Sequence, residues 1–484
     1  MRTLFIFSLA LLSLSAVAQK VGKPETYAKT ITAADLKKHL YIVAGAEMEG
    51  RETATAGQRK AAAYIESEFK RLGLQPGAGS GYQQQYPVYQ DSLLEARLEV
   101  NGTAFALNTD FNANASGLDA TMRFSEVTFL PSGLTADSMN ALNLAGKLVM
   151  MQAGGGMQYA ALQGKGIAAI LLISPAYPRT TPPMLRSQML YSFRKSITPQ
   201  SFTISPSVAQ AILKTSVDSA RLRTDNKPYK ADVLLQLKKQ TTELQSSNVL
   251  GVLPGSDLKD EYLFITAHYD HLGKRGDSII NYGADDDGSG TVGVLELADA
   301  FVQAKKRGNG PRRTIVFMTV SGEEKGLWGS EYYGDHPLFP LEKTTADLNI
   351  DMIGRSDSSR KGDTTNYVYV VGDDKISSEL KPISEAANAK YTKLELDYKF
   401  NDPNDRNRIY YRSDHYNFAK NGVPIIFYYD GMLGADYHRP TDTPDKINYP
   451  LLAKRAQLVF YTAWDMANRP QMLKRDTPLP KLSR

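Results

Sequence analysis

Residues 262–267 have the sequence YLFITA, and residues 268–271, which follow them directly, have the sequence HYDH. An almost wholly apolar run of this length predicts a strand that is buried on both faces of a sheet. The residues after it carry two imidazoles and a carboxylate. A buried strand that ends in such side chains indicates an α/β protein with functional residues at the carboxyl edge of a parallel sheet.

The same alternation continues on both sides of this stretch. Apolar runs predict further strands at residues 248–253, 314–320, 346–350, 367–371 and 424–428. Residues 288–303, 377–390 and 449–466 are predicted to be helices. Strands that alternate with helices predict an α/β fold, with a mostly parallel mixed sheet and helices on both of its faces.

Five polar segments each come just after an apolar strand. They contain His268, Asp285-Asp286-Asp287, Glu323-Glu324, Asp351 and His438. Because loops from several parallel strands converge at one edge of a sheet, we expect these side chains to lie close together. Three adjacent aspartates repel one another at neutral pH, and a bound divalent cation or full exposure to solvent relieves that repulsion. The pattern therefore predicts a metal site.

Two metal ions fit this set of ligands best. One bridging carboxylate, with an imidazole and an acid on each side, makes two zinc sites that share a water molecule. Metal ions roughly 3.5–4 Å apart can hold a scissile carbonyl and lower the pKa of that water. A further carboxylate must then take the proton, and the paired glutamates allow one ligand and one base. The chain has no cysteine, so its ligands are nitrogen and oxygen atoms, which suit hydrolytic zinc.

Composition narrows the class of protein further. With 484 residues, the chain is long enough for two domains with sizeable cores. Hydrophobic residues make up 42% and charged residues 23%, which is typical of globular proteins. The formal net charge of +5 is not concentrated in any basic run. This argues against a nucleic-acid partner, for which a basic stripe is expected.

The first 18 residues have the features of a signal peptide. Arg2 supplies a positive charge, residues 4–14 are mainly apolar, and Ala16-Val17-Ala18 precedes the predicted cleavage site before Gln19. A membrane-spanning helix needs about 20 apolar residues, which neither this stretch nor any later one provides. We therefore expect export to the periplasm or the extracellular space, without stable insertion into the membrane.

Residues 121–235 differ from the rest of the chain in their sequence pattern and are predicted to form an inserted domain. Apolar runs at residues 147–151 and 167–173 predict two strands with a small-residue helix between them. The glycines at residues 154–156 lack a Walker lysine and the spacing of a dinucleotide fingerprint, so we expect a turn there.

From residue 247 to residue 438 the chain resembles the M28 family of zinc peptidases, the aminopeptidase Y-like class of co-catalytic enzymes. Residues 48–51 (MEGR) and 57–58 (GQ) resemble the N-terminal part of such members. The insert resembles their β-rich protease-associated (PA) domain. Together with the signal peptide at 1–18, the resemblance implies peptidase-domain segments at 19–120 and 236–484 and an inserted PA-like domain at 121–235.

The resemblance also implies a role for each residue of the site. His268 and Asp351 correspond to ligands of one zinc ion, His438 and Glu324 to ligands of the other, and Asp286 to the ligand that bridges them. Glu323 corresponds to the general base and acid, and Asp270 to a carboxylate that orients His268. Tyr437 corresponds to a tyrosine that stabilises the oxyanion in some relatives. The implied substrates are peptides with a free N-terminus.

Other polar residues are expected to have supporting roles. Asp285 and Asp287 are expected to shape the turn and cap a helix, and His271 to lie at the pocket rim or in a loop. Residues 413–415 (SDH) are expected to support the site without forming a catalytic triad. Surface positions are expected for His39 and His336, and a structural ion pair for Arg51.

Two further enzymatic functions remain open, together with a non-enzymatic one. The same metal site serves C-terminal glutamate carboxypeptidases, and Arg406, Arg408 and Arg412 are candidates for binding a terminal carboxylate. It also serves glutaminyl cyclases, which are described with one zinc ion. A binding protein that has kept the fold but lost catalysis is the third alternative, and such proteins lose ligands, whereas this chain keeps all five and the base.

Overall fold

The computed structural model describes residues 22–154, 162, 164–177, 188–191, 193–195, 198–222, 227–276, 278–402, 404–434 and 436–479. The predicted signal peptide lies outside the described residues. The chain divides into two compact units: one contains the chain up to Gln85 and from Ser246 onward, and the other is Tyr86–Gln245. Each unit has a hydrophobic core of its own.

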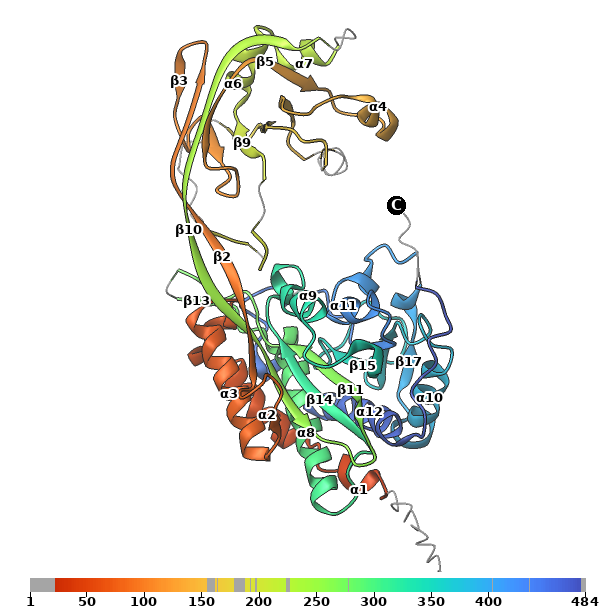
Figure 1. Ribbon diagram of the computed structural model, residues 1–484. Helices are drawn as coiled ribbons and strands as arrows, with labels where there is room; N and C mark the ends of the chain where they lie inside the picture. The colour runs from red at the N-terminus through yellow and green to blue at the C-terminus, as the bar shows by residue number, and fades with distance from the viewer. Residues whose placement is uncertain are drawn as a thin grey trace, which may run out of the picture. The chain divides into compact units, whose positions relative to one another are not determined.

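A mixed, mostly parallel sheet forms the centre of the first unit (Figure 1). Its strands in spatial order are β17 (Glu395–Asp397), β16 (Tyr367–Val371), β18 (Ile425–Tyr429), β15 (Thr344–Ile350), β11 (Leu258–His268), β14 (Arg313–Val320) and β10 (Tyr229–Leu253), which also pairs with β1 (Gln75–Pro76). β11 is parallel to β14 and β15, and β15 is parallel to β18. β10 and β16 run antiparallel to β14 and β18. The predicted fold class is confirmed.

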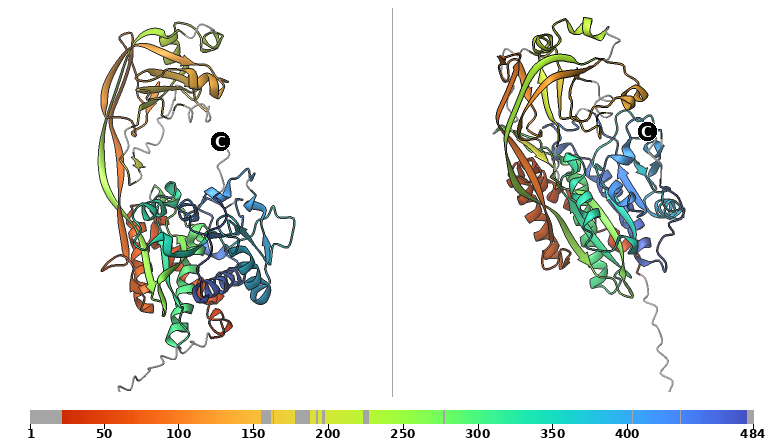
Figure 2. Two further views of the ribbon diagram at one scale, coloured as in Figure 1. Left: turned by 45° about the vertical axis from the view of Figure 1, so that its right-hand side comes forward. Right: turned by 45° about the horizontal axis from the view of Figure 1, so that its top comes forward.

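Helices cover both faces of this sheet (Figures 1 and 2). The helices of this unit are α1 (Glu25–Ala28), α2 (Ala33–Val43), α3 (Ala56–Leu72), α8 (Gly290–Lys306), α9 (Trp328–Asp335), α10 (Leu380–Ala387), α11 (His415–Ala419) and α12 (Tyr449–Asn468). Successive side chains of a strand point to opposite faces. Leu263 and Ile265 of β11 pack in one core cluster with α3, α8 and α12. Phe264, between them, contacts Tyr333 of α9 and Phe418 of α11 on the other face.

Local signals begin and end these helices. The side chain of Thr55 accepts a hydrogen bond from the backbone N–H of Gln58 and so caps the first turn of α3. Gly73 follows the last turn in a left-handed conformation, with a φ of 83° that favours glycine. Asn448 caps α12 in the same way as Thr55 caps α3, by accepting from the N–H of Leu451.

The second unit, Tyr86–Gln245, is rich in β-structure. Its strands are β2 (Gln83–Val100), β3 (Thr103–Phe105), β4 (Phe111–Ala113), β5 (Ala120–Leu130), β6 (Leu148–Gln152), β7 (Ala169–Ile173), β8 (Gln188–Tyr191), β9 (Gln200–Ile204) and part of β10, with helices α4 (Ala136–Ala141), α6 (Pro206–Leu213) and α7 (Val217–Arg221). The two strands predicted in the insert correspond to β6 and β7, which are parallel. The helix predicted between them falls largely outside the described residues.

The limits of this unit differ from the predicted bounds of the insert, 121–235. β2 begins before the second unit and continues into it. β10 pairs with β5 through its first residues and with β14 through its last. Because both strands cross the boundary without a break, no turn or change in composition marks it in the sequence.

Candidate metal centre

The five predicted metal ligands come from the ends of neighbouring elements of the first unit. His268 is the last residue of β11, and Asp351 follows β15 directly. Asp286 lies in the helical turn η2 (Ala284–Ser289) before α8, and Glu324 lies in the turn η3 (Glu323–Lys325) after β14. His438 lies in the segment after β18. All five reach the carboxyl edge of the parallel strands, where open α/β sheets bind ligands.

Asp286 lies between the two histidines. Its Oδ1 is 3.3 Å from Nε2 of His268, and its Oδ2 is 3.1 Å from Nε2 of His438. His268 Nε2 is also 3.5 Å from Oδ1 of Asp351, and His438 Nε2 is 3.1 Å from Oε2 of Glu324. The structure thus arranges the residues as two groups that share one carboxylate.

These distances suit zinc. Two ligand atoms about 2.0–2.1 Å from one tetrahedral zinc ion lie roughly 3.3 Å apart. Nε2 of His268, Oδ2 of Asp286 and Oε1 of Glu324 are buried and make no hydrogen bond with the described residues. Buried polar atoms normally have a partner, so atoms of this kind that face one another fit a bound cation. The donor set of imidazoles and carboxylates is one that zinc prefers.

The charges at this centre interact strongly with one another. Burial opposes ionisation of Asp286, but the imidazoles of His268 and His438 beside it hold its pKa well below the usual value. Burial likewise disfavours protonated His438, yet contacts with Asp286 and Glu324 raise its pKa to about 10. Carboxylates that hold protons on their imidazole neighbours favour a divalent cation in the same place.

Glu323 lies beside the ligands without being central to either group. Its Oε2 is 4.0 Å from Nε2 of His268. Burial, together with the charges of Glu324 and Asp351, raises the pKa of the Glu323 carboxyl well above its ordinary value. A carboxylate that accepts a proton readily and borders the metal centre has the properties of a general base.

Asp270 is fully buried and contacts His268 differently from the predicted way. Nδ1 of His268 lies 3.1 Å from the backbone oxygen of Asp270 and 3.7 Å from its carboxylate Oδ1. The carboxylate instead accepts hydrogen bonds from Thr53 Oγ1, at 2.6 Å, and from the backbone N–H of Glu323, at 3.2 Å. The residue therefore connects His268, the N-terminal segment and the turn that carries Glu323.

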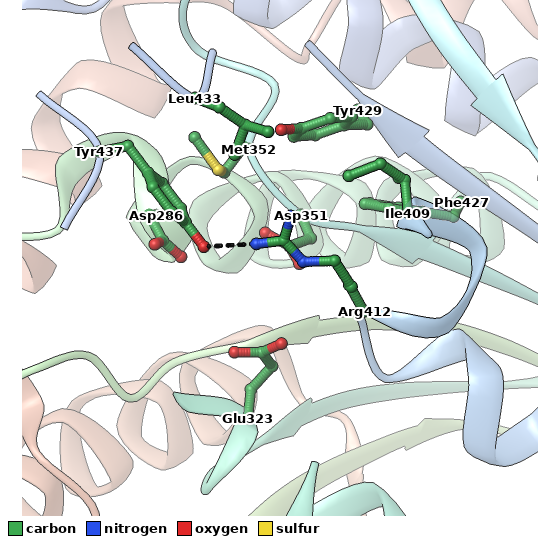
Figure 3. A pocket seen from close by; sticks show the side chains of 10 residues that line it. All are labelled: Asp286, Glu323, Asp351, Met352, Ile409, Arg412, Phe427, Tyr429, Leu433 and Tyr437. Carbon is green, nitrogen blue, oxygen red and sulfur yellow. Dashed lines mark hydrogen bonds between the residues drawn. The ribbon is translucent and has the colours of Figure 1, made fainter. Parts of the chain in front are cut away.

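A pocket opens onto this centre (Figure 3). It is lined by Asp286, Glu323, Asp351, Met352, Ile409, Arg412, Phe427, Tyr429, Leu433 and Tyr437. Nη2 of Arg412 donates a hydrogen bond of 3.1 Å to Oη of Tyr437, which borders Asp286 in the view. Tyr437 thus lies where it can donate a hydrogen bond to a molecule bound in the pocket.

His271 is closer to the centre than its sequence position indicated. It is fully buried rather than at a pocket rim, and its Nδ1 is 2.7 Å from Oε1 of Glu324. His271, Asp286 and Glu324 form a group that could hold a metal, as do His268, Glu323 and Asp351. However, His271 Nδ1 is 3.9 Å from Oδ2 of Asp286, whereas His438 Nε2 lies 3.1 Å from both carboxylates. This geometry favours His438 as the ligand and His271 as a neighbour that orients Glu324.

Two residues that the sequence reasoning did not connect with the site hold the turn that carries Asp286. The carboxylate of Asp442 accepts hydrogen bonds from the backbone N–H groups of Asp285 and Asp286. The guanidinium of Arg51 is fully buried and donates to the carbonyls of Tyr282 and Gly283, each at 2.8 Å. No local pattern could have revealed these contacts, because the partners are far apart in the chain.

The remaining polar residues have structural partners. Asp287 accepts from the N–H groups of Gly290 and Met352, and Asp285 accepts from that of Gly354. Residues 413–415 are hydrogen-bonded in turn to Asn349, to Ser330 and to the carbonyl of Tyr410.

Two predictions about polar residues were wrong. His39 is buried against Tyr64 and Glu296 rather than exposed, since α2 packs beside α3 and α8. Arg51 donates to backbone carbonyls, including those of Val43 and Tyr269, instead of forming an ion pair.

This sheet edge, where two imidazoles and three carboxylates lie together beside a pocket, defines the first unit as an α/β module with a candidate metal centre. Residues 248–463 match the model of a family described as Peptidase family M28. This part of the chain is therefore a peptidase family M28 domain, as the resemblance predicted.

Curated relatives match the same half of the chain. A probable leucine aminopeptidase of Arthroderma otae is 29% identical over 225 residues, which cover 46% of this chain and 57% of that protein. A probable zinc metalloprotease of Pyrenophora tritici-repentis is 28% identical over 267 residues, which cover 47% and 52%. The chain thus spans about half the length of the curated relatives that it matches.

Solved structures show the same fold over nearly the whole chain. An aminopeptidase from Aneurinibacillus sp. strain AM-1 aligns with a TM-score of 0.59 at 20% identity, covering 95% of this chain and 100% of that one. A zinc aminopeptidase from Bacillus subtilis aligns with a TM-score of 0.53 at 20% identity, covering 93% and 98%. Within the described residues, the structure has no helix long and apolar enough to cross a membrane.

Proposed function

We propose that this chain is a zinc aminopeptidase that binds two metal ions and releases N-terminal residues from peptides. The observation that carries the proposal is the position of Asp286, whose two carboxylate oxygens each face a different histidine. His268 and Asp351 would hold one zinc ion, His438 and Glu324 the other, and Asp286 both. The curated relatives named as a leucine aminopeptidase and a zinc metalloprotease support this assignment.

The residues around the metal centre divide the remaining chemistry among them. When bound, the zinc ions would polarise the scissile carbonyl and lower the pKa of a water molecule. Glu323, whose pKa is raised chiefly by burial, would accept a proton from a water molecule and pass it to the leaving amine. Tyr437 donates a hydrogen bond to the oxygen that becomes negatively charged. His271 and Asp270 keep the ligand and base segments in place.

Replacing Glu323 by Gln tests the mechanism. The variant keeps the shape of the side chain but cannot accept a proton, so we expect kcat on aminoacyl anilides to fall by about 10²- to 10⁴-fold. Zinc content, measured by elemental analysis, should stay at two ions per chain. Glu342→Gln, which changes an exposed glutamate of the same unit, is the control and should retain full activity. Wild-type activity in the Glu323→Gln variant would remove Glu323 from the mechanism.

The pocket also bears on the alternative functions. Arg412 lines it, whereas Arg406 and Arg408 line a different cavity, so the three arginines do not converge on one carboxylate site. The two ligand groups favour two metal ions over the single zinc ion of a cyclase. Assays of aminoacyl anilides beside peptides with a C-terminal glutamate would separate aminopeptidase from carboxypeptidase action.

We further propose that the chain is exported and that its second unit is a PA-like domain. The signal-like residues 1–18 support export, and the β-rich composition of Tyr86–Gln245 supports the second assignment. Sequencing the N-terminus of the protein recovered from the periplasm or the medium tests the first proposal. A mature N-terminus at Gln19 is expected.

A further inference from the structure

The pocket beside the metal centre has two chemically different sides. Asp286, Glu323 and Asp351 belong to the proposed metal centre and its base. The opposite side is apolar or aromatic and consists of Met352, Ile409, Phe427, Tyr429 and Leu433. Figure 3 shows these five side chains grouped above and to the right of the carboxylates. A substrate with its first carbonyl at the metal centre would place its first side chain against this apolar side.

Arg412 is the cationic residue among those that line this pocket. Its stem rises from the loop after Ile409, and its guanidinium extends towards Tyr437 (Figure 3). The side chain is exposed, and within the described part of the chain its hydrogen bond to Tyr437 involves a neutral partner and no carboxylate lies within 4.0 Å. A guanidinium has five N–H donors, so most of them remain available to a bound molecule.

Three other cationic side chains near the centre contact carboxylates. Arg355 and Lys446 both pair with Asp436, at 3.0 and 2.7 Å, and Lys325 pairs with Glu52 at 2.7 Å. Arg412, by contrast, has no ion pair with the described residues and presents its positive charge to whatever occupies the pocket. Opposite charges attract and like charges repel over such distances, and the effect is larger where bound substrate excludes water.

We propose that Arg412 determines which charge is accepted on the N-terminal residue of the substrate, disfavouring lysine and arginine relative to neutral side chains. This inference rests on the proposed aminopeptidase function. The apolar side of the pocket binds the aliphatic part of a side chain, and the guanidinium repels a cation at its tip. An acidic tip gains an ionic hydrogen bond to the same group. We expect kcat/KM to be highest for apolar N-terminal residues, lower for acidic ones and lowest for basic ones.

Two pairs of substrates isolate the charge. Norleucyl and lysyl anilides have side chains of nearly equal length and differ in the terminal cation, and glutaminyl and glutamyl anilides differ in the terminal anion. For the wild-type protein loaded with zinc, we expect kcat/KM for norleucyl to exceed that for lysyl by on the order of ten- to a hundredfold. Arg412→Gln should bring this ratio close to one, and Arg412→Glu should invert it. The glutamyl-to-glutaminyl ratio should fall in both variants.

The Arg412 variants also lose the hydrogen bond to Tyr437, and comparing ratios of kcat/KM within a substrate pair removes the effect of that loss. Loss of that bond lowers kcat for every substrate by a similar factor, which cancels between the members of a pair. Arg408→Gln changes an arginine of the same loop that lines the other cavity, so it should leave both ratios unchanged.

A measurement on the unmodified protein gives a second test. Salt screens an exposed charge, so the norleucyl-to-lysyl ratio of the wild type should shrink between about 0.05 M and 1 M sodium chloride. The inference is wrong if both Arg412 variants keep the wild-type ratios, or if the wild-type ratio does not respond to salt. If instead the zinc-loaded wild type cleaves no aminoacyl anilide, the proposed function itself fails.

Discussion

The carboxylate of Asp270 accepts a hydrogen bond from the backbone N–H of Glu323, although 53 positions separate the two residues in the chain. The same carboxylate accepts from Thr53 Oγ1, and the Asp270 carbonyl faces Nδ1 of His268. One buried residue thus ties the proposed base to a proposed ligand. A displacement of Asp270 would therefore move the base relative to the metal centre.

Asp270→Asn tests this connection. The amide keeps the volume of the carboxylate but has one acceptor oxygen, so it cannot accept from both Thr53 Oγ1 and the N–H of Glu323, and we expect kcat to fall by about 10- to 100-fold. KM should change little, because Asp270 does not line the pocket. Steady-state kinetics together with zinc analysis provide the measurement. Thr53→Ser, which retains the hydroxyl donor, is the matched control, and an equal loss in it would point to a general disturbance of this segment.

His271→Gln distinguishes an orienting residue from a ligand. If Nδ1 of His271 holds Glu324 in place, the variant should bind two zinc ions at saturation but with about 10- to 100-fold weaker affinity for one of them. His438→Ala should reduce the stoichiometry to one. Titration calorimetry with zinc resolves both numbers, and His336→Gln, at an exposed histidine, serves as control. The reverse outcome, with one ion in His271→Gln and two in His438→Ala, would exchange the two roles.

Residues that follow buried strands could be placed at one edge of the sheet from the sequence, because strand direction decides where those ends meet. This reasoning predicted that His268, Asp351 and Glu324 lie at one edge of the sheet, and in the structure His268 lies 3.5 Å from Asp351, while Glu324 lies 3.1 Å from His438. The contact between Asp442 and the turn of Asp286 involves two loops whose paths are decided by tertiary packing. Pattern and spacing contain no information about such a contact.

The boundary of the inserted unit was difficult for a related reason. Strand periodicity shows which face of a strand is buried, but not which core covers it. β10 alternates between buried and less buried residues along its first half, where it pairs with β5, and is buried throughout its last residues, where it pairs with β14. A single strand that passes from one core to another gives a continuous signal in sequence.

Removal of Arg51 should destabilise the first unit. Its guanidinium donates to the carbonyls of Val43, Tyr269, Tyr282 and Gly283, all between 2.7 and 2.8 Å. Arg51→Met fills much of the same space but leaves these acceptors without partners, so we expect the free energy of unfolding to fall by about 3–5 kcal/mol. Urea denaturation followed by circular dichroism measures the change.

The control for this variant is Arg59→Met. Arg59 is exposed and donates to a single carbonyl, that of Ala54, so its loss should change the free energy of unfolding by no more than about 0.5 kcal/mol. Arg51→Met should also bind zinc more weakly, since Tyr282 and Gly283 precede the turn that carries Asp286. Equal stability in the two variants would contradict a structural role for Arg51.

The buried carboxyl of Asp373 should make the free energy of unfolding depend on pH. Its carboxylate is buried just after β16, neither oxygen has a hydrogen-bond partner within the described residues, and burial raises its pKa to about 7. An unfolded aspartate titrates near pH 4, so between about pH 4 and pH 7 the folded chain binds more protons than the unfolded one. Stability contributed by neutral Asp373 is therefore fully present below pH 4 and is lost as the pH rises through 7.

Asp373→Asn removes this dependence. The variant should match the wild type at pH 4 and exceed it at pH 8 by on the order of 2 kcal/mol in the free energy of unfolding, because the amide never acquires the charge. Urea denaturation at a series of pH values gives the two curves. Asp374→Asn is the control, and its effect on the free energy of unfolding should have the opposite sign. Asp374 pairs with Lys375 at 2.9 Å, and that pairing helps to lower its pKa. Parallel curves for the wild type and Asp373→Asn would show that the carboxyl of Asp373 titrates as an exposed aspartate does.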